Sequence, residues 1–402
     1  MNDATLGSYA EVVLTVGLNF KPGRTLLIDA QIEHAPLVRA LADRAYAAGA
    51  TYVDIWYWEP VAKASRLRYA REETLAQVPR WIGQRYEEAI ADGCCYVRIA
   101  GDPAAGILDA IDPRRVGLDR LPAVTQRNDL QTHMLGEWIV VAYPTAAWAQ
   151  RVFGDPDVDR LSELLAQFMR LDQRNPAAAW KTHLERLEHR AAQLNRLDLR
   201  AIRLDGPGTA LQLGLADDHR WCTAAATSQL GVRFVINMPT EEVFTSPRRD
   251  AADGVVSASL PLVLAGSVVE GLSLTLAGGR ITEVRARRGA DTVRGYIATD
   301  DGAARLGEIA LVDGTSPLSS SGQLFYETLL DENAASHIAW GSGIPQTWAG
   351  YDEEKSLPPW LNKSAVHVDF MVGSDEVTVT GIDAAERSHP ILDGRRWCLT
   401  DD

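Results

Sequence analysis

The first half of the chain alternates continuous apolar runs with stretches whose apolar residues recur at helical spacing. Residues 24–32, RTLLIDAQI, form an apolar run with the length of a buried strand. The stretch APLVRALADRAYAAGA at 35–50 has helical periodicity, and TYVDIWYW at 51–58 is rich in residues that favour strands. A strand, a helix and a strand in this order predict a βαβ unit, and with it a mainly parallel sheet covered by helices.

The pattern changes after a long helical stretch. Residues 157–195 have helical spacing, whereas beyond Arg200 the chain consists of short strand patterns separated by turn residues, such as TALQLGL at 209–215 and EIALVD at 308–313. We therefore predict an α/β N-terminal domain with a mainly parallel sheet over residues 1–195, and an α+β, β-rich C-terminal domain over residues 196–402. The length of 402 residues agrees with two domains.

Composition excludes several classes of function. The formal charge of −14 argues against nucleic-acid binding, which depends on clustered Lys and Arg. No apolar run approaches the roughly 18 residues of a membrane helix, and the N-terminus MNDATLGSYAEVV lacks the basic and apolar segments of a targeting signal. The turn DAQIEHAP lacks the glycines of a dinucleotide site. We expect a cytoplasmic protein with no nucleic-acid or membrane partner.

Potential metal ligands lie at the ends of predicted elements in the second half of the chain. His367 and Asp369 are two apart in the strand pattern HVDF, so both point to one face of that strand. An isolated H-x-D pair is more often a polar strand face than a metal site. The full set of candidates is Glu242, Glu308, Glu332, His337, His367 and Asp369.

Three of these candidates have local sequence that leaves their role open. Glu308 enters the apolar run IALV, where a buried carboxylate would need a cation or hydrogen-bond donors, although a solvent-facing turn fits equally well. In DENAASH, Asp331 or Asn333 could simply cap a helix. Glu332 and His337, five residues apart, can converge only if the helix ends between them.

Three long motifs bring these residues together. The segments NMPTEEVFTSP at 237–247, ARLGEIALVDGTSPLSSSGQLFYETLLDENAASHIAWG at 304–341 and NKSAVHVDFMVGS at 362–374 resemble the thermophilic aminopeptidase family, the M29 metallopeptidases. The resemblance also covers YAEVVLTVGLNFKPGRTLLI and DGPGTALQLGL, and thus nearly the whole chain.

The resemblance implies a function and a site. It implies two divalent metal ions per chain, with zinc first and cobalt, manganese or magnesium as alternatives, held by the six candidates. It further implies a homodimeric aminopeptidase that hydrolyses the N-terminal residue of short peptides through a metal-bridged hydroxide. Our choice for the catalytic proton relay is Glu308. The C-terminal domain is then the catalytic domain.

One position departs from the family pattern. Family members usually have a tyrosine seven positions after the first histidine of the set, where this chain has Ile344 in GSGIP. Tyr326 or Tyr351 could supply the missing phenol. We take Trp340, Ile344 and Tyr351 as candidates for the substrate pocket, although Trp340 fits ordinary packing equally well.

Two alternatives keep the scaffold and change the activity. His337, His367 and Asp369 form a two-histidine, one-carboxylate set, so a non-haem Fe(II) ring-cleaving dioxygenase of the 2,5-dihydroxypyridine dioxygenase type is one alternative. The three glutamates argue against it, because a mononuclear iron site does not need them. The second alternative is a catalytically impaired relative, which Ile344 alone suggests.

Overall fold

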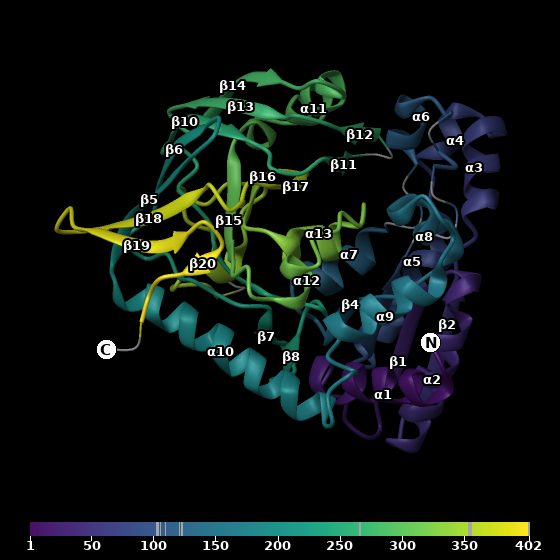
Figure 1. Cartoon of the computed structure of the whole chain (residues 1–402). Helices are drawn as coiled ribbons and strands as arrows, with labels where there is room; N and C mark the ends of the chain where they lie inside the picture. The colour runs from purple at the N-terminus through teal and green to yellow at the C-terminus, as the bar shows by residue number, and fades with distance from the viewer. Residues whose placement is uncertain are drawn as a thin grey trace. The chain divides into compact units, whose positions relative to one another are not determined.

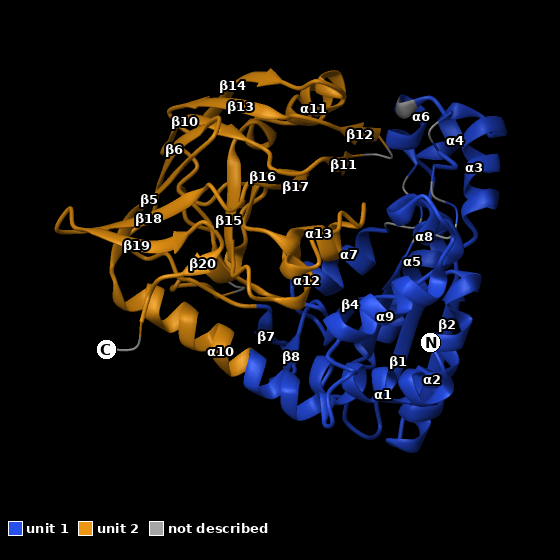
Figure 2. Cartoon of the chain, in the orientation of Figure 1, with its two compact units in different colours: residues 1–183, 224–239 blue, residues 184–223, 240–402 orange. Residues whose placement is uncertain are grey.

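The chain is divided into two compact units in a computed structural model (Figure 2). The structure describes residues 1–400 except 102, 103, 105, 109, 120, 122, 123, 265, 266 and 353–355. Unit 1 comprises residues 1–183 and 224–239, and unit 2 comprises residues 184–223 and 240–402. The division between residues 183 and 184 falls inside helix α10 (Pro176–Arg196). We predicted the domain boundary after residue 195, one residue before this helix ends.

Unit 1 is built on a parallel sheet, as predicted (Figure 1). The strands β1 (Thr25–Ala30), β2 (Tyr52–Tyr57), β3 (Cys95–Ala100) and β4 (Trp138–Ala142) pair in the order β2-β1-β3-β4. Helix α2 (Ala35–Ala47) connects β1 to β2, which confirms the βαβ unit. Five of the six residues of β1 are buried, because helices cover both faces of a parallel sheet.

The remaining elements of unit 1 are mostly helices. They are α1 (Asp3–Val12), α3 (Pro60–Tyr69), α4 (Glu72–Leu75), α5 (Arg80–Ala91), α6 (Pro113–Leu118), α7 (Thr125–Thr132), α8 (Ala146–Phe153), α9 (Val158–Phe168), the π-helix Val13–Gly17, the 3-10 helix Ile32–His34, and the strands β7 (Ala225–Thr227) and β8 (Arg233–Val235).

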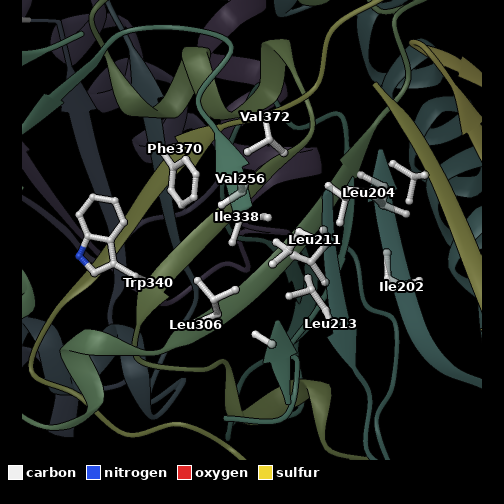
Figure 3. Close-up of a cluster of buried hydrophobic side chains, with 14 of the residues drawn as sticks. Ile202, Leu204, Leu211, Leu213, Val256, Leu306, Ile338, Trp340, Phe370 and Val372 are labelled. Carbon is white, nitrogen blue, oxygen red and sulfur yellow. The ribbon is translucent and has the colours of Figure 1, made fainter. Parts of the chain in front are cut away.

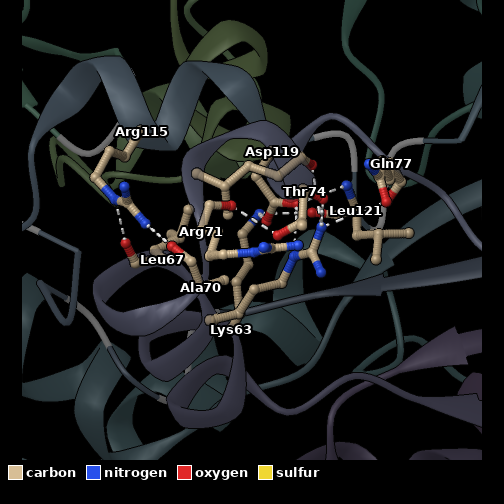
Figure 4. A network of polar contacts seen from close by, with 11 residues as sticks. Lys63, Leu67, Ala70, Arg71, Thr74, Gln77, Arg115, Asp119 and Leu121 are labelled. Carbon is tan, nitrogen blue, oxygen red and sulfur yellow. Dashed lines mark hydrogen bonds and ion pairs between the residues drawn. The ribbon is translucent and has the colours of Figure 1, made fainter.

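Buried polar contacts fasten the helices of unit 1. Figure 4 shows one network, which includes Lys63, Thr74 and Asp119. The fully buried carboxylate of Asp119 lies 3.3 Å from Arg66 Nε and 3.7 Å from Lys63 Nζ. Arg66 also donates to the Thr74 carbonyl at 3.0 Å, so a single guanidinium joins α3 to the end of α4. Burial lowers the pKa of Lys63, and Asp119 partly offsets that effect. The network is therefore a structural clamp.

Unit 2 contains a large antiparallel sheet, in agreement with the predicted β-rich region. Its order is β14-β13-β10-β6-β5-β18-β19-β20. The strands are β5 (Leu199–Gly206), β6 (Thr209–Gly214), β10 (Ala252–Ser257), β13 (Ser273–Ala277), β14 (Arg280–Arg285), β18 (Thr378–Asp383), β19 (Ser388–Asp393) and β20 (Arg396–Trp397). Smaller elements are β11 (Leu262–Leu264), β12 (Ser267–Val269), α11 (Ala290–Ile297), α12 (Pro317–Ser320), α13 (Thr328–Ala334) and the 3-10 helices Gly302–Ala304 and Pro345–Thr347.

A second, four-stranded antiparallel sheet of unit 2 carries the candidate ligands. Its order is β17-β16-β15-β9, with β9 (Glu242–Thr245), β15 (Leu306–Val312), β16 (His337–Gly341) and β17 (His367–Met371). Side chains from both sheets meet in one hydrophobic cluster, in which Figure 3 shows Leu204 and Leu211 of the large sheet with Ile338 and Phe370 of the small one. One face of the small sheet therefore packs in the hydrophobic core.

Candidate metal centre

The strand register places the candidate ligands on the other face of the small sheet. Glu308 pairs with Ala339, which pairs with Asp369, so these side chains lie on one face. His337 and His367 lie two residues before Ala339 and Asp369 on their strands, and therefore share that face. Glu242 pairs with Val312, four residues after Glu308. The face carries five candidates: Glu242, Glu308, His337, His367 and Asp369.

Trp340 lies on the opposite face. It is fully buried in the hydrophobic cluster, with its ring centroid 5.6 Å from that of Phe370 (Figure 3). Alternation along β16 explains this placement, because Trp340 is three residues from His337 and so points the other way. The structure does not bring this substrate-pocket candidate to the metal cluster.

Two groups of three candidates have ligand atoms close enough to share an ion. In Glu242, Glu308 and His337, and in Glu308, His367 and Asp369, one ligand atom from each residue lies within 4.8 Å of the others. Glu242 Oε2 is 3.2 Å from His337 Nε2, and Glu308 Oε2 is 3.1 Å from His367 Nε2. Because Glu308 belongs to both groups, the two groups adjoin.

The histidine rings are oriented by backbone carbonyls. Nδ1 of His337 lies 3.2 Å from the Ala335 carbonyl, and Nδ1 of His367 lies 2.7 Å from the Ser342 carbonyl. A carbonyl oxygen only accepts hydrogen bonds, so Nδ1 carries the proton and the lone pair of a neutral ring is on Nε2, the atom that faces the carboxylates. This is how proteins present histidine to a metal ion.

Two buried carboxylate oxygens of the cluster lack hydrogen bonds from the described residues, and a bound cation would compensate for this. Glu242 Oε2 and Asp369 Oδ1 are buried and have no hydrogen-bond partner within the described part of the chain, although each has a histidine Nε2 within 3.4 Å. An Nε2 lone pair and a carboxylate repel each other unless a proton or a cation lies between them. Oxygen and imidazole ligands suit Zn²⁺ and related divalent ions, so the residues fit a metal.

Burial and mutual charge shift the ionisation of the whole cluster. Burial raises the pKa of Glu308, and the charges of Asp369 and Glu242 add to that rise against the opposing effect of His367. Burial alone would lower the pKa of His337, but Glu242, Asp369 and Glu308 outweigh it and raise that pKa to about 10. Of the five side chains, His367 is the accessible one, with 34% of its side chain exposed.

Glu332 is carried by helix α13 and not by the small sheet. The helix ends at Ala334 and Ala335 has extended backbone, so the break between Glu332 and His337 that their convergence requires is present. Glu332 is outside both three-residue groups. Burial raises its pKa well above the ordinary value, and the charges of Asp369 and Glu242 raise it further. Its carboxyl group is therefore close enough to interact electrostatically with the cluster.

A β-bulge sets the direction of Glu308. The register between β15 and β16 shifts between Leu306 and Glu308, which leaves Gly307 as the extra residue. A Cβ on Gly307 would lie 2.2 Å from the Ser342 carbonyl oxygen, the atom that orients His367. The glycine in LGEIALV was the available sequence signal for this contact.

The remaining pocket candidates follow β16. The Ile344 amide donates to Ser246 Oγ at 2.9 Å, and Ser246 comes directly after β9, the strand that pairs with the Glu308 strand. This bond places the backbone of Ile344 at the border of the cluster. Tyr351 is half-buried beyond the 3-10 helix Pro345–Thr347, and its amide donates to the Trp348 carbonyl at 3.0 Å.

A buried sheet face that gathers carboxylates and imidazoles in adjoining groups is typical of metal-dependent hydrolases. The sequence model of the thermophilic metalloprotease family (M29) matches residues 2–397, and the chain belongs to this family. It is therefore a peptide hydrolase that uses divalent metal. None of the described helices combines the length and apolar character that a membrane crossing requires.

Relatives named as aminopeptidases agree with this assignment over 98% of the chain. The chain is 37% identical to aminopeptidase 2 of Geobacillus stearothermophilus and 37% identical to aminopeptidase T of Thermus thermophilus, with 98% of each chain covered in both comparisons. It is also similar to the solved structure of wild-type AmpT from Thermus thermophilus, with a TM-score of 0.90 and 35% identity, over 98% of this chain and 99% of that one.

Proposed function

We propose that this chain is a dimetal aminopeptidase that removes N-terminal residues from short peptides. The observation that carries the proposal is the pair of adjoining ligand groups that share Glu308. Two groups with one carboxylate in common suit two ions about 3.5 to 4 Å apart. The names of the relatives support exopeptidase action. Zinc is our first choice of metal, followed by cobalt, manganese and magnesium.

The six site residues would have two kinds of role, metal binding and proton transfer. Divalent ions bound here would polarise the scissile carbonyl and lower the pKa of water towards about 7. Glu242, Glu332, His337, His367 and Asp369 would hold the ions, with both histidines oriented through Nδ1. We propose Glu308 as the shared ligand and retain it as the candidate for proton transfer.

Metal content and exopeptidase activity test this proposal together. Freshly purified protein is analysed for metals and assayed on amino-acid p-nitroanilides, short peptides and the same peptides with acetylated N-termini. About two zinc or cobalt ions per chain, chelator-sensitive cleavage and inert acetylated peptides are expected. One iron per chain with oxygen consumption and no peptide cleavage would instead support the dioxygenase alternative, which the relatives reported above do not support.

A Glu308→Gln variant separates the two roles proposed for that residue. Amide oxygen is a weaker ligand than carboxylate and cannot take up a proton at neutral pH. Loss of bound metal together with activity would assign Glu308 as a ligand. Retention of both metals with loss of turnover would assign it to proton transfer. Unchanged metal content and activity would exclude both roles.

The impaired-relative alternative is favoured by one observation, Ile344 at the border of the cluster. An Ile344→Tyr variant tests it, because the bond from the residue 344 amide to Ser246 fixes the backbone whatever the side chain. Wild-type protein that binds two metals without cleaving any substrate would support impairment. Activity that appears only in I344Y would show that Ile344 limits an otherwise competent site.

Assembly and location extend the proposal, the assembly by family resemblance. We propose a homodimer, for which size-exclusion chromatography with light scattering should give about twice the chain mass of 43.9 kDa. A monomer mass at all concentrations would contradict it. We further propose a cytoplasmic location, which fractionation of the source cells would test. Ile344 and Tyr351 remain our candidates for the substrate pocket.

A further inference from the structure

Asn333 joins two segments that carry candidate ligands. It follows Glu332 on α13 and is fully buried. Its Oδ1 accepts a hydrogen bond from the Glu241 amide at 2.7 Å, and its Nδ2 donates to the Leu329 carbonyl at 2.9 Å. Glu241 directly precedes Glu242, so one hydrogen bond connects the neighbours of two candidate ligands.

We propose that Asn333 is a positioning residue that holds Glu332 in register with Glu242, an inference that rests on the proposed metal site. Asn333 itself contacts neither ion in this proposal. It links helix α13 to the residue that directly precedes strand β9. Metal affinity should therefore depend on Asn333 beyond any effect on folding.

Helix α13 needs such an anchor because it is short. It has seven residues, well below the length at which an isolated helix is stable. Among the described residues, no side chain forms a capping hydrogen bond at its N-terminus, and its C-terminal flanking residue, Ala335, is extended. The position of Glu332 must therefore come from contacts with the rest of unit 2.

Glu332 lies between two buried polar anchors. On one side, Asp331 accepts from the Phe325 amide at 2.7 Å and from the Glu327 amide at 3.0 Å, which ties the helix to the segment that enters it. On the other side, Asn333 ties the helix to the segment that enters β9. The three residues of the DEN motif thus have separate tasks: an anchor, a candidate ligand and a second anchor.

The anchor on the β9 side acts where the sheet does not. Glu242 is the first residue of β9 and pairs with Val312, so the sheet ladder holds it from one direction. Glu241 lies outside the ladder. The hydrogen bond that its backbone amide donates to Asn333 Oδ1 fixes the chain direction at the entrance to β9, and with it the Cα–Cβ direction of Glu242.

A purely structural role would give a different result in a metal titration. A buried asparagine that only stabilises the fold would lower stability when replaced and leave the affinity of the folded protein unchanged. Replacement of a positioning residue should lower the metal affinity of the folded protein by about 10- to 100-fold, the usual effect of losing a group that orients metal ligands. Affinity of the folded protein therefore separates the two roles.

The experiment compares Asn333→Leu, Asn333→Asp and a control, Asn195→Leu. Leucine has a similar size and no hydrogen bonds, whereas aspartate keeps an acceptor for the Glu241 amide. Asn195 accepts from the Trp221 amide at 2.8 Å and donates to the Trp221 carbonyl at 3.0 Å, so N195L also removes two side-chain bonds to backbone. Chelator-treated proteins are titrated with Co²⁺ by absorption and Zn²⁺ by calorimetry, beside thermal unfolding of the metal-free forms.

We expect N333L to lose at least tenfold in affinity for one ion, N333D to stay closer to wild type, and N195L to bind as wild type does. Folded N333L with unchanged affinity would overturn the inference. Should N333L fail to fold, N333D losing affinity as strongly as a ligand variant such as Glu332→Gln would overturn it. Wild-type protein that binds no metal would instead overturn the proposed function.

Discussion

Gly307 offers the sharpest test of how the backbone supports the site. An alanine Cβ at this position would lie 2.2 Å from the Ser342 carbonyl oxygen, 2.5 Å from its carbon and 2.6 Å from the Gly341 oxygen. All three are backbone atoms, so no side chain can turn away to make room. Gly307 does not have positive φ in this structure, so Gly307→Ala tests steric contact rather than backbone conformation.

The displaced atom determines the expected effect. The Ser342 carbonyl holds Nδ1 of His367 at 2.7 Å, and His367 is within 3.4 Å of both Glu308 and Asp369. Overpacking of this kind lowers the free energy of unfolding by about 1–3 kcal/mol. Loss of the ring-orienting bond lowers metal affinity by about 10- to 100-fold. We therefore expect G307A to fold with reduced stability and to bind metal, above all in the His367 group, much more weakly.

Urea unfolding of the metal-free protein and a Zn²⁺ titration measure the two effects separately. Gly295→Ala is the matched control, because a Cβ there meets nothing within 4 Å and Gly295 lies in helix α11, where alanine is the better helix former. G295A should be as stable as wild type or more so, with unchanged affinity. G307A that binds Zn²⁺ as tightly as wild type would refute the link from Gly307 through Ser342 to His367.

Three further outcomes follow from the structure. Trp340→Ala should lower the free energy of unfolding by about 3–5 kcal/mol, measured by urea denaturation, while the folded variant keeps its metal affinity; weakened metal binding would place Trp340 in the site after all. Burial lowers the pKa of His34, whose ring lies between the Gln31 amide and the Gly101 carbonyl. The unfolded chain therefore binds the proton more readily than the folded chain does. This contribution to stability is present above about pH 6.5 and is lost as the pH falls. Between pH 7 and 5, the free energy of unfolding should fall less for His34→Asn than for the wild type, and equal slopes for the two proteins would contradict this. Chelation of the metal should lower the thermal unfolding temperature. Free metal at about 100 times its Kd should raise the free energy of unfolding again by about 2.7 kcal/mol. Equal unfolding temperatures with and without metal would exclude a linkage between metal binding and folding.

Side-chain alternation explains which parts of the site could be predicted from the sequence. The spacing of His367 and Asp369 was enough to put both on one face of β17. The same rule, applied to His337 and Trp340, puts Trp340 on the opposite face from the ligands, because the two residues are three positions apart. The first strand, helix and second strand were also predicted correctly, because their periodicity is strong.

The meeting of four strands could not be predicted in this way. Glu242, Glu308 and His337 come from segments up to 95 positions apart, and their convergence depends on the antiparallel register of β9, β15 and β16. The bulge at Gly307 shifts that register by one residue, and a shift of one residue reverses the faces. The carbonyls of Ala335 and Ser342 that orient the histidines have no signature in residue type at all.

The two faces of the small sheet depend on each other. Burying four carboxylates together with two imidazoles lowers the stability of the fold. The buried oxygens of Glu242 and Asp369, which have no hydrogen-bond partner in the described chain, contribute to this loss. The opposite face, with Ile338, Trp340 and Phe370 in the core, supplies stabilisation that does not depend on metal. The sheet should therefore persist in the metal-free protein, with the ligands held in place for an incoming ion. A rigid sheet that exists before the metal arrives also explains why the positions of single backbone atoms, such as the Ser342 carbonyl, should matter to affinity.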